Sequence, residues 1–161
     1  DEYAIGYALA LLDRLETEAK NSDCSRGQHG CAIVTADTLE LLSMCINGAA
    51  VYGAGCKRPD EPGNCGCVHA ETNALIADRQ SSLIDRFAFV TGAPCESCAD
   101  NLIAAGIKRV IYRRITRIGF AGAETLSKAG IPHGTVADFY GPGGSARGAT
   151  AVHRESHHLP L

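Results

Sequence analysis

The sequence predicts a layered α/β domain with parallel pairs of strands. Through the second half of the 161-residue chain, short apolar stretches alternate with helix-forming stretches. Strands and helices that alternate in this way form parallel strand pairs connected by helices. The composition agrees, because 45% hydrophobic and 20% charged residues are typical of a globular chain. A chain of this length suits one domain with a sizeable core.

The first half is expected to contain one helix, two strands and a long loop. Apolar residues at helical spacing predict a helix over 3–20, and these residues are Ile5, Ala8, Leu9, Leu12 and Leu15. Residues 30–35 and 39–46 form a neighbouring pair of strands around the turn 36–38. The loop 47–68 is rich in glycine and proline, and it contains three cysteines. A loop this long is usually functional or disordered, and the cysteines favour function.

The second half alternates regularly. Helices are expected at 69–79, at 95–105 before Gly106, and at 123–129 before Gly130. Strands are expected at 87–91 and 107–112, with a fifth at 135–139. We expect a domain over residues 1–140, and a glycine-rich C-terminal tail over 141–161.

Charge and hydropathy exclude several functional classes. The formal net charge of −3 makes nucleic acid an unlikely partner. No apolar run reaches the roughly 18 residues that span a bilayer, so no membrane partner is expected. The apolar residues 4–12 follow Asp1 and Glu2, whereas a secretory signal carries positive charge there. We therefore expect a cytoplasmic protein.

Four residues form a split metal signature. His69-Ala70-Glu71 is followed further along the chain by Pro94-Cys95-Glu96-Ser97-Cys98. One imidazole and two thiolates leave the fourth zinc position open to water, as in catalytic rather than structural zinc sites. The pattern His-x-Glu and Pro-Cys-x-x-Cys is the signature of zinc-dependent deaminases that act on cytosine or adenine rings.

The spacing indicates how these residues meet. Cys95 and Cys98 begin a helix and share one face of it. His69 and Glu71 lie on different sides of a helix, so they share a site only at its N-terminus. We therefore expect two helix N-termini to meet at one zinc. The zinc lowers the pKa of a water molecule, and Glu71 is expected to move its proton to the ring and to the departing ammonia. A structural zinc site or a redox pair remains the alternative for the cysteines.

The flanking residues resemble the deoxycytidylate (dCMP) deaminase family. The resemblance covers roughly residues 3–138 and is carried by residues 24–34, Asn47-Gly48-Ala49-Ala50, 69–75, 94–99, 105–110 and 129–131. It implies a three-layer α/β/α cytidine-deaminase-like fold with a five-stranded mixed sheet. It also implies catalytic zinc at His69, Cys95 and Cys98, with Glu71 as the proton shuttle. The implied partners are a small nucleotide and further copies of the chain, in a homo-oligomer that is a dimer or a hexamer.

The resemblance suggests further site residues. Asn47 would hydrogen-bond the sugar or base, unless it is only a turn residue. Some members of the family carry a second, structural zinc, and Cys24, Cys56 and Cys65 stand at the matching places, with Cys67 able to replace or assist Cys65. The alternative is that these thiols are free. Arg26 is a candidate for binding phosphate, with a structural salt bridge as the alternative.

Some residues depart from the family pattern. His29 and Cys31 stand where the family usually has Val and Ala. A basic cluster follows the fourth strand, and its members are Lys108, Arg109, Arg113, Arg114 and Arg117. We expect hydrolytic deamination of dCMP to dUMP and ammonia. The alternatives are another substrate, which includes tRNA adenosine, a free nucleoside or base and a 5-modified dCMP, or a non-catalytic zinc-binding module.

Overall fold

A five-stranded mixed sheet in the order β2-β1-β3-β4-β5 forms the centre of the molecule. The computed structural model describes residues 2–79, 83–146 and 148. The strands are β1 (Gly30–Thr35), β2 (Leu41–Ile46), β3 (Arg86–Gly92), β4 (Ile107–Arg114) and β5 (His133–Gly134). β1 is antiparallel to β2 and β3, whereas β3, β4 and β5 are parallel. The five-stranded mixed sheet expected from the sequence is confirmed.

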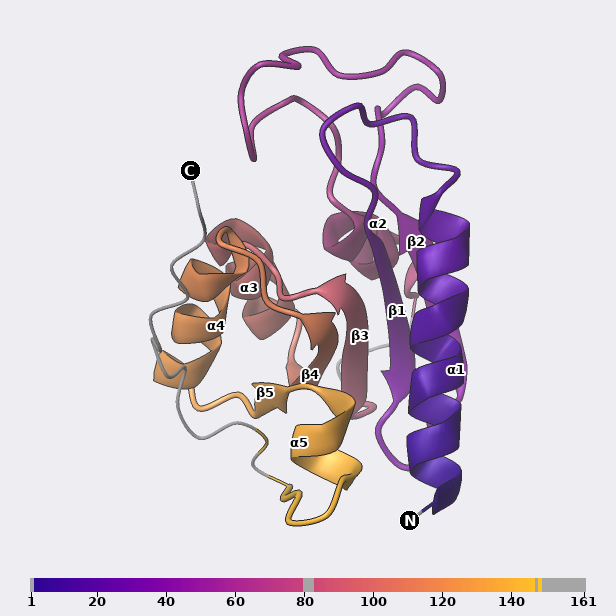
Figure 1. The fold of residues 1–161 in the computed structure, drawn as a ribbon, viewed down its shortest axis with the longest axis vertical. Coiled ribbons are helices and arrows are strands. Elements are labelled where there is room, and N and C mark those ends of the chain that lie inside the picture. The colour runs from indigo at the N-terminus through magenta and orange to yellow at the C-terminus, as the bar shows by residue number, and fades with distance from the viewer. Residues whose placement is uncertain (1, 80–82, 147, 149–161) are drawn as a thin grey trace.

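Helices cover both faces of the sheet, as Figure 1 shows. They are α1 (Glu2–Ala19), α2 (Ala70–Ala77), α3 (Glu96–Ala104), α4 (Gly119–Lys128) and α5 (Val136–Tyr140). One apolar core lies between the sheet and α2, α3 and α4, and a second lies between the sheet and α1 and α5. Alternate residues of β1 enter the two cores, with Cys31 in one and Ala32 in the other. Burial on both faces explains why this strand is a continuous apolar run.

The helix α1 buries a slightly different stripe from the expected one. Ala8, Leu11, Leu12, Leu15 and Ala19 are buried, at the spacing of one helix face. Leu9, which we placed on the stripe, is 45% exposed. Leu11 occupies the inner face instead, because it lies one helical turn from Ala8 and Leu15.

The fifth strand was predicted in the wrong place. Residues 136–140 form the helix α5, and β5 is the two-residue strand just before it. Thr135 and Phe139 favour a strand by composition. Thr135 and Asp138, however, form a capping box, in which each side chain accepts from the backbone N–H of the other residue. This reciprocal pairing satisfies the first free donors of the helix and starts it.

The long loop lies beyond one end of the sheet, at the top of Figure 1. Its ends are tied together by an isolated antiparallel bridge between Gly48 and Val68. Among the described residues, none of the helices has both the length and the apolar character to cross a bilayer. Most of the expected tail, residues 147 and 149–161, lies outside the described residues. Its first part hydrogen-bonds back to the domain, for example from Ser145 N to Asp138 O, and the boundary at residue 140 stays a prediction.

Candidate active site and metal centres

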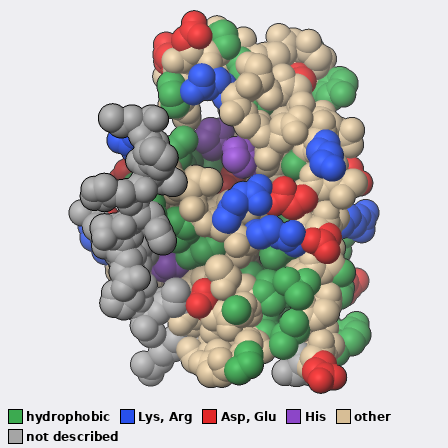
Figure 2. Space-filling model, in the orientation of Figure 1, with side chains coloured by type: hydrophobic (Ala, Val, Ile, Leu, Met, Phe, Trp, Pro, Cys, Tyr) green, Lys and Arg blue, Asp and Glu red, His purple; other side chains and the backbone are tan. Residues whose placement is uncertain are grey.

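The sheet order brings the candidate residues to one edge. Because β1 runs antiparallel to both neighbours, its first residues lie beside the last residues of β2 and β3, with Cys31 opposite Cys45 and Val90. Residues before β1 and after β2 and β3 therefore gather there, around a cavity of about 150 Å³. Its lining includes Arg26, His29, Asn47, His69, Glu71 and Cys95. Figure 2 shows histidine side chains in a hollow of this face.

Two helix N-termini meet in the cavity, as the sequence predicts. His69 is the N-cap residue of α2, and Cys95 is the N-cap residue of α3. His69 Nδ1 lies 3.6 Å from Cys95 Sγ and 3.2 Å from Cys98 Sγ. The partial positive charge of a helix N-terminus favours thiolate, the form of cysteine that binds metal.

These three side chains fit a zinc ion. A tetrahedral zinc with Zn–S bonds of about 2.3 Å and Zn–N bonds of about 2.05 Å separates a sulfur from a nitrogen by about 3.6 Å. The His69–Cys95 separation of 3.6 Å has this value, and the His69–Cys98 separation of 3.2 Å is shorter. All three ligand atoms lie within 4.8 Å of one another. Three protein ligands leave one tetrahedral position for water, as in catalytic zinc sites.

The electrostatics of the site suit metal binding and proton transfer. Hydrogen bonds with Cys98 and His69 lower the pKa of the Cys95 thiol to about 4, so this group is a thiolate at neutral pH. Glu71 is the second residue of α2 and is only 6% exposed. Burial raises the pKa of its carboxyl group above the ordinary range. A carboxyl group that is shifted toward neutrality can both accept and return a proton.

The two expected substrate residues lie in the wall of the same cavity. The Asn47 amide is already engaged, since its Nδ2 donates to Gly27 O at 2.9 Å and its Oδ1 accepts from His29 N at 2.8 Å. Arg26 is exposed, and no acidic side chain among the described residues pairs with it. The salt bridge that we considered for Arg26 is therefore absent there.

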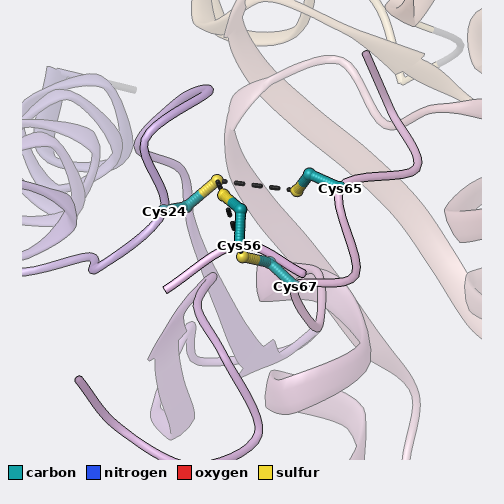
Figure 3. A group of neighbouring side chains, drawn as sticks. All are labelled: Cys24, Cys56, Cys65 and Cys67. Atoms are coloured by element: carbon teal, nitrogen blue, oxygen red, sulfur yellow. Dashed lines mark hydrogen bonds between the residues drawn. The ribbon is translucent and has the colours of Figure 1, made fainter. Parts of the chain in front are cut away.

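A second group of candidate metal ligands lies beside the first. Cys24, Cys56, Cys65 and Cys67 converge from three segments of the chain, as Figure 3 shows. Cys24 Sγ lies 3.6 Å from Cys56 Sγ and 3.8 Å from Cys65 Sγ, and Cys56 Sγ lies 3.6 Å from Cys67 Sγ. Two sulfurs on a tetrahedral zinc are about 3.8 Å apart, so this four-thiol cluster also fits the ion.

Cys67 is the fourth thiol of the cluster, whereas the sequence indicated only that it could replace or assist Cys65. The signal for it is the Cys65-Gly66-Cys67 spacing. Gly66 has a φ of +89°, a conformation that favours glycine. The chain therefore turns between the two cysteines, and both sulfurs reach the same point.

Asp23 is a further residue that the sequence did not reveal. Its carboxylate accepts from Ala49 N at 2.9 Å and from Gly53 N at 2.7 Å. These backbone hydrogen bonds lower the pKa of Asp23. The side chain thus fixes the start of the long loop next to Cys24, where the four-thiol cluster begins.

Three members of the basic cluster have structural partners. Arg113 and Arg114 pair with Asp13 and Glu16 of α1, at 2.6 and 2.8 Å. Arg109 stacks between Phe87 and Phe139, with its guanidinium carbon 4.5 Å from each ring centroid. These contacts hold β4 to its surroundings, so they provide no support for an RNA-binding surface.

Comparisons with known proteins agree with this geometry. Residues 7–114 match the family model described as the cytidine and deoxycytidylate deaminase zinc-binding region. A deoxycytidylate deaminase of Mycobacterium phage D29 is 35% identical over 127 residues, which cover 70% of this chain and 92% of the relative. A probable deoxycytidylate deaminase of Caenorhabditis elegans is 34% identical over 114 residues, which cover 66% of this chain but 57% of the relative.

The fold is also similar to that of a relative of known structure. A dCMP deaminase from cyanophage S-TIM5, in a crystal structure with dCMP and dUMP, superposes with a TM-score of 0.67 and 27% identity. The match covers 78% of this chain and 93% of the phage protein. With the family model matching most of the chain and the metal-binding side chains in place, this chain belongs to the cytidine and deoxycytidylate deaminase family.

Proposed function

We propose that this chain is a zinc-dependent enzyme that hydrolyses dCMP to dUMP and ammonia. The observation that carries the proposal is the buried Glu71 beside His69, Cys95 and Cys98 in one cavity. A purely structural zinc site has no use for a buried acid beside an open coordination position. The relatives from the mycobacteriophage and the nematode are both deoxycytidylate deaminases by name, the latter a probable one.

The residues of the site divide the reaction between them. Bound by His69, Cys95 and Cys98, zinc would supply a water of lowered pKa. Glu71 accepts one proton of the attacking water and delivers it to the ring nitrogen. It then moves the second proton of that water, from the new hydroxyl group on the ring carbon, to the amino group that leaves as ammonia. The oxygen of the water thus becomes the new carbonyl oxygen of uracil. Burial favours this shuttle, because it raises the pKa of Glu71 and so makes its carboxylate a better acceptor for the proton of the water.

Substrate binding is assigned to the rim of the cavity. Asn47 positions the loop around the nucleotide through its two backbone partners, and its cavity-facing edge is the candidate contact for the sugar or base. Arg26 is the candidate phosphate ligand, because it is exposed in the cavity wall and pairs with no acid among the described residues.

The four-thiol cluster is proposed to bind a second, structural zinc, with Cys67 as its fourth ligand. Hydrogen bonds from Ser25 lower the pKa of the Cys56 thiol to about 6, so a thiolate is available at neutral pH. Four protein ligands leave no position for water, which suits a structural role. The zinc would offset the conformational entropy lost in ordering the long loop.

The homo-oligomer and the cytoplasmic location belong to the same proposal. Exposed apolar side chains at Val51, Tyr52 and Ile118 offer contact area for a second copy of the chain. All eight cysteines lie within the described residues and none forms a disulfide, which suits a reducing compartment. Light scattering of the zinc-loaded protein would measure the oligomeric state.

A substrate panel tests the reaction. The purified protein is offered dCMP, dCTP, deoxycytidine, cytosine and a tRNA anticodon stem, and ammonia release is measured. We expect the highest kcat/KM with dCMP. A preference for the tRNA stem, or for free nucleoside or base, would contradict the substrate but not the chemistry. If none of the five compounds releases ammonia, both the proposed substrate and the proposed chemistry are contradicted, and a non-catalytic zinc-binding module is favoured.

A further inference from the structure

His29 occupies a defined position at the rim of the cavity. It is the last residue before β1, and its backbone is held on both sides by Asn47. His29 N donates to Asn47 Oδ1 at 2.8 Å, and Asn47 N donates to His29 O at 3.1 Å. The imidazole is exposed in the wall that also contains His69 and Glu71. The ring is therefore presented to the cavity from a fixed backbone.

The hydrogen-bonding capacity of this ring is unused within the described part of the chain. Among the described residues, no backbone or side-chain atom hydrogen-bonds either ring nitrogen of His29. The neighbouring Gln28 behaves differently, since its Nε2 donates to Lys20 O at 3.1 Å. An imidazole always carries at least one N–H donor. The cavity wall thus contains a fixed donor with no partner in the described protein.

The ring of His29 lines the same cavity as Arg26. A Cβ atom built on Gly27 would lie 2.8 Å from His29 Nε2, so the imidazole folds back over Gly27. Glycine at this position leaves the space that the ring occupies. Arg26 adjoins Gly27 and also lines the cavity. Arg26 and His29 therefore line one cavity from positions three residues apart in the chain.

The difference in burial between Glu71 and the pair Arg26 and His29 indicates how a nucleotide would be oriented in the cavity. Glu71 is 6% exposed and lies at the closed end of the site, whereas Arg26 and His29 are exposed. A nucleotide that places its base against Glu71 must direct its charged end outward, toward that rim. The acidic groups near His29 are Glu16 and Cys95. Glu16 is paired with Arg114 at 2.8 Å, and Cys95 is a candidate zinc ligand, so neither leaves an unpaired negative charge against a phosphate.

We propose that His29 is a specificity-determining residue that binds the 5′-phosphate of the substrate together with Arg26. This inference rests on the proposed function. A phosphate presents only acceptors, so it suits an arginine fork and an imidazole N–H. His29 thereby favours a nucleotide over the nucleoside that lacks the phosphate.

Comparison of two substrates in three variants tests the role of His29. We measure kcat/KM for dCMP and for deoxycytidine in the wild type, His29→Val, His29→Gln and the control Gln28→Val. Loss of one hydrogen bond to a charged group lowers kcat/KM for dCMP about 10-fold or more in His29→Val. The ratio of dCMP to deoxycytidine activity falls with it. His29→Gln restores part of the ratio, because its amide donates too, and Gln28→Val leaves the ratio unchanged.

The outcomes separate this inference from the proposed function. If His29→Val lowers kcat/KM equally for both substrates, or does not lower it for dCMP, the role of His29 is overturned and the proposed deamination is unaffected. CMP and cytidine are measured in the same variants. A wild type that prefers CMP to dCMP, with its preference for CMP over cytidine lost in His29→Val, would overturn dCMP as substrate but support His29. Zinc content and the thermal midpoint are measured for each variant, and a misfolded His29→Val is replaced by His29→Leu, which also lacks a hydrogen-bond donor.

Discussion

Asn47 and His29 hydrogen-bond each other twice, once through the Asn47 side chain and once through the Asn47 backbone. The same side chain also donates to Gly27 O. One amide therefore joins the end of β2 to the loop that enters β1. That loop forms one wall of the cavity, so the position of the wall depends on Asn47.

Replacing Asn47 with alanine should loosen this wall. Asn47→Ala leaves Gly27 O and His29 N without their partner, which costs about 1–3 kcal/mol. The free energy of unfolding, measured by urea denaturation, should fall by that amount. Asn64→Ala is the control, because Asn64 is an exposed residue that donates to Glu61, and a change below about 0.5 kcal/mol is expected. Unchanged stability in Asn47→Ala would show that the amide is free to serve the substrate alone.

Glu71→Gln should separate metal binding from turnover. The amide keeps the size of the side chain but cannot shuttle protons, so kcat should fall about 10²- to 10⁴-fold. The zinc content, measured by atomic emission, should stay at the wild-type value because the three ligands are intact. Glu61→Gln, a change of an exposed carboxylate in the long loop, should leave kcat as it is. Turnover within tenfold of the wild type in Glu71→Gln would refute the role given to this residue.

Metal analysis should find two zinc ions per chain. Cys56→Ala should reduce the zinc content to one per chain, because one of the four thiols is lost. Cys45→Ala is the matched control, since Cys45 is a free, half-buried thiol outside both groups, and it should retain two. A wild-type protein with one zinc per chain would eliminate the four-thiol site.

Gly122 should tolerate no side chain. A Cβ atom there would lie 1.8 Å from Pro94 O, in the segment that leads to Cys95. Gly122→Ala should therefore destabilise the fold by about 1–3 kcal/mol or more, as overpacking does, and zinc binding should weaken. Gly6→Ala is the contrast, because nothing lies within 4 Å of its Cβ position in α1. It should stabilise the protein by about 0.5–1 kcal/mol, the usual advantage of alanine in a helix. Equal denaturation midpoints for the two variants would contradict this packing.

The buried His133 should make stability depend on pH. It hydrogen-bonds Tyr112 and Ser127, at 3.0 and 2.7 Å. Burial lowers the pKa of His133 below its ordinary value of 6.5. Below that value the unfolded state binds more protons than the folded state, so stability is full above pH 6.5 and declines as the pH falls.

Substitution isolates this contribution. His133→Gln should be less stable than the wild type at pH 7, and its thermal midpoint should fall less steeply between about pH 6.5 and 5, because glutamine does not titrate. The difference between the two pH profiles removes the effect of the other histidines. Parallel profiles would show that His133 does not carry the dependence.

Local patterns in the sequence were enough to predict most of the fold and the centre of the site. The apolar runs of β1 and β3 and the helix starts at His69 and Cys95 are visible without tertiary information. The short β5 is not, because its two residues contain no strand pattern, and only their pairing with Val110 and Ile111 of β4 makes them a strand. The partners of Asn47, Asp23 and Cys67 also depend on segments that are distant in sequence. Such contacts are products of tertiary packing.

Cys24, Cys65 and Cys67 belong to the four-thiol cluster and also line the cavity that contains Glu71. These three cysteine side chains therefore form part of the cavity wall. Alkylation of these three thiols would therefore alter the wall of the cavity directly, without modifying the carboxyl group of Glu71.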